Sequence, residues 1–108
     1  MIRYDDFEKV DMRIGTILKA EPNPRARKPA YSLTIDFGPL GKRTSSAQIT
    51  DLYAPEDLVG RQVVAVVNFP SKVIAGISSE VLILGVDGDG GVALLGPERQ
   101  VTNGKRVY

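Results

Sequence analysis

Short apolar stretches, cut apart by glycine and proline, limit the fold of this chain more than any other feature of its sequence. Tyr31–Phe37 reads YSLTIDF, with an apolar residue at every second position, which is typical of a strand with one buried face. Met12–Glu21 also alternates, whereas Arg61–Phe69 is almost wholly apolar, as in a strand buried on both faces. The sequence therefore predicts an all-β domain of about six short strands.

The segments between these strands predict loops, one hairpin and two short helical turns. Three prolines make Pro22–Ala30 a loop, and Pro70–Ser79 is also expected to be a loop. Alternating glycine and aspartate at Asp87–Gly91 separate two further strands, which indicates a hairpin. Asp5 is expected to cap a helical turn near the N-terminus. Proline at the start and glycine after the end predict a second turn at Pro55–Leu58.

The order of these elements points to one small barrel. Three strands, a short helical connection and further strands suit a five-stranded Greek-key barrel of the OB-fold type. Gly15, inside the first strand, is expected to mark a bulge or a sharp bend. A length of 108 residues is that of one ordinary domain. We therefore expect a single all-β OB-fold domain over residues 1–108, with a short N-terminal helical turn and a C-terminal extension outside the barrel.

The composition excludes the commonest kinds of catalytic and metal site. The chain has no cysteine and no histidine, so it offers no thiolate nucleophile, no serine–histidine triad and no ordinary zinc site. We therefore expect a protein that is not an enzyme and that needs no cofactor or metal. The absence of cysteine favours the reducing cytoplasm. No apolar run approaches the roughly 20 residues that cross a bilayer, so membrane insertion is not expected.

Charge is nearly balanced over the chain but gathers in one region. The net charge is +1, yet residues 25–43 hold five basic side chains and a single acidic one. The five basic residues are Arg25, Arg27, Lys28, Lys42 and Arg43. Two interpretations stay open: a solvated loop face, or a patch that attracts an anionic ligand.

The expected third strand, RTSSAQIT at Arg43–Thr50, is unusually polar for a barrel strand. Because strand side chains alternate between two faces, Ser45 shares one face with Ala47, and Ser46 shares the other with Gln48. Ala47 is the natural inward residue. We therefore expect Ser45 to be buried, and Ser46 and Gln48 to face a ligand groove.

A second polar stretch, NFPSKVIAGISSE at Asn68–Glu80, follows the apolar strand. In one interpretation Asn68 ends the strand and Gly76 forms a turn. In the other, an amide, a cation, hydroxyls and a carboxylate converge at one rim of the barrel, where loops commonly carry binding residues.

Three stretches of the chain resemble the CsaA export-chaperone family: DFEKVDMRIGTILKAE, SSAQITDLYAPEDLVGRQVVAVVNFPSKVIAGISSEVLILG and GVALLGPERQVTNGKRV. The likeness extends from residue 6 to residue 107, and ARKPAYSLTIDFG and SSAQIT are its most specific parts. That family is related to the tRNA-binding domains at the end of bacterial methionyl-tRNA synthetases. The shared features are a D-x-R-x-G-x-I opening that begins at Asp11, a strand that ends in Asn68, and a G-x-x-S step from Gly76 to Ser79.

The chain departs from these tRNA-binding relatives at three places. The loop after the first strand lacks their histidine and their Asp-Lys-Leu segment. Ser45–Gln48 replaces their Val-Ser-Gly strand, and Glu80 and Val81 replace the Gly-Met pair that follows their G-x-x-S step. A carboxylate thus stands where an RNA phosphate would approach, which fits the CsaA branch better than an RNA-binding one.

The resemblance implies an ATP-independent chaperone that binds unfolded polypeptides, notably preproteins bound for export, and that meets components of the export translocase. It also implies a homodimer that uses the C-terminal extension and the N-terminal segment. The alternative is a tRNA or structured-RNA binding protein that uses the same rim of the barrel. Hydroxyls and amides would pair with any peptide backbone, phenylalanines would supply apolar contact, and basic groups would hold acidic segments. The candidate ligand-binding residues are Arg25, Arg27, Lys28, Phe37, Arg43, Ser45, Ser46, Gln48, Asn68, Phe69, Lys72, Ser79 and Glu80.

Overall fold

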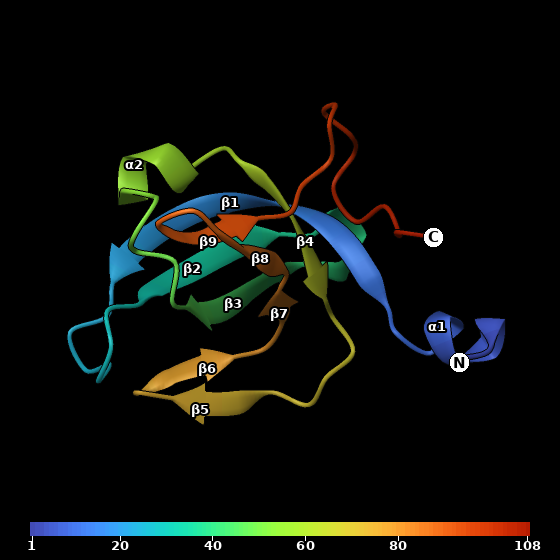
Figure 1. The fold of residues 1–108 in the computed structure, drawn as a ribbon, viewed down its shortest axis with the longest axis horizontal. Helices are drawn as coiled ribbons and strands as arrows, with labels where there is room; N and C mark the ends of the chain where they lie inside the picture. Colours follow the sequence, from blue (N-terminus) through green and yellow to red (C-terminus); the bar gives the residue numbers. More distant parts are fainter.

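Strand β1 (Met12–Pro22) is the longest element and organises the sheet. The structure, a computed structural model that describes all residues 1–108, pairs the first half of β1 with β4 (Gln62–Val66). The second half pairs with β2 (Tyr31–Asp36), and both pairings are antiparallel. A register shift between Ile17 and Lys19 interrupts the pairing with β2. Such a shift bends a strand, and the curved β1 spans both neighbours (Figure 1).

The five-stranded sheet curls into a nearly closed barrel. Its order is β3–β2–β1–β4–β7, with β3 (Lys42–Ala47) and β7 (Leu82–Ile83) at the two edges. Helix α2 (Pro55–Leu58) lies between β3 and β4 in the chain, where the sequence predicts a helical turn. The strand order and the position of α2 confirm the predicted OB-fold barrel.

Alternation in β2 builds much of the core. Tyr31, Leu33 and Ile35 are buried, while the residues between them are partly exposed. Gly15 in β1 is packed so closely that a Cβ there would lie 2.7 Å from side-chain atoms of Ile35 and Phe37. The bulge predicted at Gly15 is not found there, because β1 pairs with β4 in regular register from Met12 to Thr16 and its register shift against β2 falls later. The glycine is required by the close approach of core side chains.

Two hairpins stand outside the barrel sheet. β5 (Lys72–Ile74) pairs with β6 (Ile77–Ser79), so the loop predicted for this segment is wrong. β8 (Gly85–Gly88) pairs with β9 (Gly91–Leu94), which confirms the predicted glycine–aspartate hairpin. The short 3-10 helix η1 (Gly38–Leu40) turns the chain from β2 into β3.

Helix α1 (Tyr4–Glu8) begins earlier than a cap at Asp5 would place it. The Asp6 carboxylate accepts a hydrogen bond of 2.9 Å from the backbone N–H of Arg3. Asp6 rather than Asp5 therefore closes the first turn, and none of the residues of α1 is buried. None of the helices has the length and the apolar character that crossing a bilayer demands.

The two ends of the chain meet at the start of β1. The backbone N–H of Val107 donates to the carbonyl of Met12 at 2.8 Å, and the guanidinium of Arg106 donates to the carbonyl of Glu8 at 2.8 Å. Both termini consequently lie on the same side of the molecule, away from the loop that joins β1 to β2 (Figure 1).

Candidate functional site

The polar strand β3 contacts residues 78–80 through side-chain hydrogen bonds and one bond between backbone groups, and these contacts close the barrel. The backbone N–H of Thr44 donates to Glu80 Oε1 at 3.0 Å, and the N–H of Glu80 donates to the carbonyl of Thr44 at 2.9 Å. The N–H of Ser46 donates to Ser79 Oγ at 3.2 Å, and the hydroxyl of Thr44 donates to the carbonyl of Ser78. These contacts cover part of an edge that has no regular strand partner.

Ser45 is the inward member of this polar row. It is 1% exposed, and its Oγ donates to the carbonyl of Val81 at 3.0 Å. The prediction that Ser45 is buried is therefore confirmed, and Ala47 is half-buried against the same core. The inclusion of Ser45 among the ligand-binding candidates is wrong, because its hydroxyl is buried and already bonded.

Hydrogen bonds from Thr44 stabilise the ionised form of Glu80 at the edge of β3. The backbone N–H of Thr44 donates to its carboxylate, and the Thr44 hydroxyl, whose one hydrogen is shared with the carbonyl of Ser78, lies 3.0 Å from the same oxygen. These hydrogen bonds, with a smaller contribution from the positive charge of Arg43, lower the pKa of Glu80 below its ordinary value, although partial desolvation opposes them. Glu80 thus fixes a negative charge beside β3.

Three adjoining hollows meet at Ser46, near the end of β3. They measure about 360 Å³ toward Phe69, about 460 Å³ toward the loop that joins β1 to β2, and about 210 Å³ between the end of β3 and β7. Ser46 lines all three, and Gln48 lines two of them. Together they form the Ser46 groove, which is lined by parts of segments 25–30, 46–49, 69–75, 79–85 and 92–94.

One wall of the Ser46 groove is basic. Arg25, Arg27 and Lys28 line it from the loop between β1 and β2. None of these three cations forms an ion pair within the chain. Their charge therefore remains available to an acidic group in the groove.

The basic loop is fastened to the β5–β6 hairpin. The side-chain amide of the buried Asn23 donates to the carbonyl of Ala75 at 3.3 Å. The guanidinium of Arg25 lies so close to Gly76 that a Cβ there would clash with it. Loop and hairpin therefore form one continuous wall above β3.

The hollow toward the hairpin carries the apolar surface of the groove. Phe69, Ile74 and Leu82 line it, and Phe69 and Leu82 remain 55% and 50% exposed. Lys72 and Glu80 line the same hollow. Exposed apolar side chains beside fixed charges suit a mixed polar and apolar ligand.

Three further candidate residues do not line the groove. Phe37 is fully buried in the core, so its predicted contact with a ligand is wrong. The Asn68 side chain accepts a hydrogen bond of 3.0 Å from the N–H of Asp11 and donates to the carbonyl of Lys9 at 2.8 Å, which favours its strand-ending interpretation. Arg43 donates from Nε to a carbonyl of η1 at 3.3 Å. Asn68 and Arg43 therefore lie outside the groove, and their contact with a ligand stays a prediction.

Other lining residues were missed by the sequence analysis. Ile74 and Leu82 line the groove, and Asn23 shapes its basic wall. A two-residue turn between the short runs KVI and ISS was the available signal for the hairpin that carries Ile74. Alanine in the first turn position hid that signal, because Asn-Gly or Asp-Gly is the usual pair.

The D-x-R-x-G opening holds the chain ends together. Arg13 Nε lies 2.6 Å from Asp11 Oδ1, and Arg13 Nη1 donates to the carbonyl of Gly104 at 3.0 Å. Arg106 Nε lies 3.7 Å from the same Asp11 oxygen. The acid and the first arginine are partly buried at the junction of β1 with the C-terminal segment, so this motif has a structural role here.

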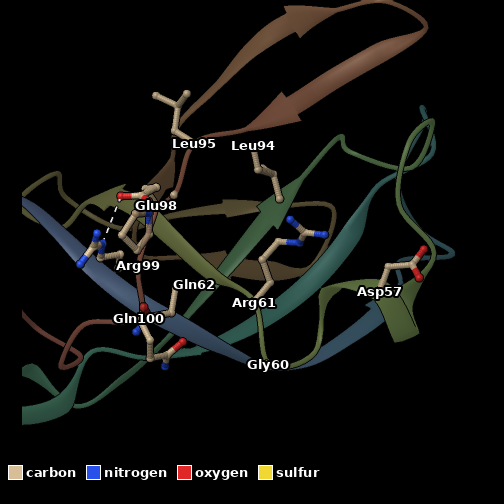
Figure 2. A pocket seen from close by; sticks show the side chains of 11 residues that line it. Asp57, Gly60, Arg61, Gln62, Leu94, Leu95, Glu98, Arg99 and Gln100 are labelled. Atoms are coloured by element: carbon tan, nitrogen blue, oxygen red, sulfur yellow. Dashed lines mark ion pairs between the residues drawn. The ribbon is translucent and has the colours of Figure 1, made fainter.

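A larger hollow, of about 570 Å³, lies between the start of β4 and residues 94–100. Figure 2 shows its charged side chains, among which Glu98 and Arg99 form an ion pair. Arg61 lies with its guanidinium carbon 5.0 Å from the centroid of the Tyr53 ring. The buried lining residue Gln62 is already bonded to the backbone of the C-terminal segment. With its buried amide already bonded and two acidic side chains balancing two basic ones, this hollow is a weaker candidate than the Ser46 groove.

Comparison with known proteins connects this fold and groove to a family. A family model described as a putative tRNA binding domain matches residues 12–106. The crystal structure of the chaperone CsaA from Bacillus anthracis str. Ames is 51% identical, with a TM-score of 0.90 over 100% of this chain and 99% of that one. The CsaA chaperone protein from Picrophilus torridus is 45% identical, with a TM-score of 0.94 over the full length of both chains.

Methionine–tRNA ligases form a second group of relatives. The ligase from Porphyromonas gingivalis is 42% identical over 107 residues, which cover 98% of this chain but 15% of the ligase. The chain therefore spans only a small part of the ligases that it matches. The chain belongs to the putative tRNA binding domain family and, within it, to the CsaA proteins.

Proposed function

We propose that this protein is an ATP-independent chaperone that holds unfolded polypeptides in the Ser46 groove. The supporting observation is the meeting, in one groove, of exposed apolar side chains with polar groups that have no partner in the chain. The function is binding rather than catalysis, it needs no cofactor or metal, and its place is the cytoplasm. The likeness to CsaA chaperones of known structure supports the same proposal.

The proposed chaperone would recognise polypeptides weakly and with little dependence on their sequence. Every peptide presents N–H and C=O groups whatever its sequence, and the hydroxyl and amide groups of Ser46, Gln48 and Ser79 can pair with them. Each such hydrogen bond contributes about 0.5–1.5 kcal/mol, so several together bind many sequences without binding any of them tightly. Phe69 and Leu82 add apolar contact. Reversible capture of this kind suits preproteins that are later passed to an export translocase.

The chaperone is proposed to act as a homodimer. Ile2 and Tyr4 at α1 are 77% and 71% exposed, and Val101 and Tyr108 in the C-terminal segment are also exposed. A five-residue helix with no buried residue gains little from its own hydrogen bonds. The apolar ends of a second copy would cover this surface.

Binding of tRNA or structured RNA is the second candidate function. It is favoured by the family match and by the three unpaired cations Arg25, Arg27 and Lys28. The near-zero net charge and the carboxylate of Glu80 beside β3 weigh against it.

A side-by-side titration separates the two functions. Fluorescence anisotropy would follow binding of a reduced and alkylated polypeptide, and of bulk tRNA, from about 50 to 200 mM salt. We expect the polypeptide to bind more tightly at the higher salt concentration. Tighter binding of tRNA there, with a salt slope that indicates several phosphate contacts, would reverse the assignment.

Matched variants locate the binding in the groove. Phe69→Ser is expected to weaken polypeptide binding by about tenfold, as the loss of a central apolar contact does. Val59→Ser removes a similarly exposed side chain, 53% against 55%, outside the groove and serves as the control. Equal effects of the two substitutions would place the binding elsewhere.

A further inference from the structure

We propose that the ligand binds by strand addition: one segment of an extended peptide pairs its backbone with the uncovered edge at Ser46, in β3, and at Gln48, just beyond the end of that strand. The inference rests on the proposed function and specifies how the Ser46 groove recognises its ligand. An exposed strand edge is a known site for the addition of an extended peptide.

The direction of the backbone groups follows from the pairing of β3. In an antiparallel pair, alternate residues direct their N–H and C=O groups toward the partner strand, and the others direct them away. Thr44 bonds with both groups to Glu80, so it faces away from β2. Ser46 follows two residues later and therefore faces away as well, as its bond to Ser79 shows.

The outward edge is covered at one end and free at the other. Glu80 occupies the N–H and the carbonyl of Thr44, and Ser79 occupies the N–H of Ser46. The carbonyl of Ser46 and the N–H of Gln48 have no hydrogen-bond partner in the chain. One acceptor in β3 and one donor just beyond its end are therefore left beside the hollows.

The two hollows that share Ser46 and Gln48 differ in chemistry. One holds the cations Arg25, Arg27 and Lys28. The other is lined mainly by apolar residues, among them Ile49 and Leu94. Because successive side chains of a strand point to opposite faces, an added peptide would direct alternate residues into these two hollows.

The ligand class follows from that division. The preferred segment is extended and alternates apolar residues, for the hollow at the end of β3, with acidic residues, for the basic wall. A peptide of alternating valine and glutamate is the simplest probe. A peptide of the same composition with valines and glutamates in two blocks is its control, and we expect it to bind about tenfold more weakly.

Backbone pairing is tested by methylation of the probe. All valine N–H groups of the extended probe lie along one edge, and all glutamate N–H groups lie along the other. We expect N-methylation of one residue type to weaken binding by about tenfold and methylation of the other type to have little effect. Equal effects, or none, would overturn the proposal.

Two substitutions at one position test the protein side. Gln48→Pro removes the free N–H without breaking any hydrogen bond of the folded chain, whereas Gln48→Ala keeps the N–H and removes only the side chain. We expect Gln48→Pro to bind the probe about tenfold more weakly than Gln48→Ala. In the unaltered protein, the probe should slow hydrogen exchange of the Gln48 amide, which requires no variant to fold.

The outcomes distinguish a failure of the strand-addition proposal from a failure of the proposed chaperone function. If the reduced and alkylated polypeptide binds but methylation, Gln48→Pro and the exchange of the Gln48 amide are all without effect, strand addition is wrong and the chaperone function stands. If neither that polypeptide nor the probe binds while tRNA does, both proposals fall.

Discussion

At the scale of single residues, the neighbouring serines Ser45 and Ser46 of β3 have different roles. Ser45 bonds across the barrel to the carbonyl of Val81, whereas Ser46 lines every hollow of the groove. Strand alternation was enough to predict which of the two faces inward. It could not predict the partner, because Val81 lies 36 residues away in the chain.

Ser45→Ala is expected to reduce stability and leave binding unchanged. The substitution removes the donor to a buried carbonyl, and an unpaired buried group costs about 1–3 kcal/mol. Urea unfolding would measure the loss, and Ser46→Ala, at a half-buried position on the other face, is the control. A Ser45→Ala protein of unaltered stability that no longer binds polypeptide would contradict this assignment.

The stabilising contribution of Glu80 should be lost in acid. Its folded-state pKa is lowered, so its contribution is fully present above the pKa of the unfolded chain, about 4.5, and is lost as pH falls through the folded-state pKa. Glu80→Gln keeps an acceptor for Thr44 but cannot ionise. We expect a smaller difference in free energy of unfolding between the two proteins at pH 3 than at pH 7, measured by urea unfolding.

The β5–β6 hairpin forms where the sequence predicted a loop. Its turn places Ala75 at a φ of 48° and Gly76 at 82°. Both central residues are left-handed, as in a type I′ turn, and alanine is a poor residue for that conformation. The elements predicted correctly, such as β2 and α2, carry residue types that agree with their local geometry.

Ala75→Asn is expected to stabilise the protein. Asparagine tolerates the left-handed region, so relief of the strain should raise the free energy of unfolding by about 0.5–1 kcal/mol. Gly76→Ala is the matched opposite: it adds a Cβ at positive φ and against Arg25, and should destabilise by about 1–2 kcal/mol. Thermal and urea unfolding would measure both. No gain from Ala75→Asn would mean that the turn adapts to alanine without strain.

At the scale of the whole molecule, the barrel was more predictable than the groove. Strand order and the position of α2 follow from local patterns that repeat along the chain. The groove brings together residues from segments centred near 27, 47, 72, 82 and 93. Their proximity depends on the way β3 meets residues 78–81, and no local pattern encodes that contact.

The proposed dimer is a prediction for the intact molecule. Light scattering at micromolar concentration is expected to give about twice the chain mass of 11.7 kDa. Tyr4→Ser, which replaces an exposed aromatic residue of α1, should shift the protein toward monomer. The control is Val73→Ser, since Val73 is 75% exposed on the β5 hairpin. A monomer mass for the unaltered protein would count decisively against the dimer.

The meeting of both chain ends at the start of β1 makes the domain easy to attach to other proteins. A tether at either terminus leaves from the side opposite the loop between β1 and β2, so it does not cross the basic wall of the groove (Figure 1). Chain ends that lie together at the surface also favour insertion and fusion. The barrel is therefore built as a portable module, because a chain joined at either end would leave the basic wall of the groove uncovered.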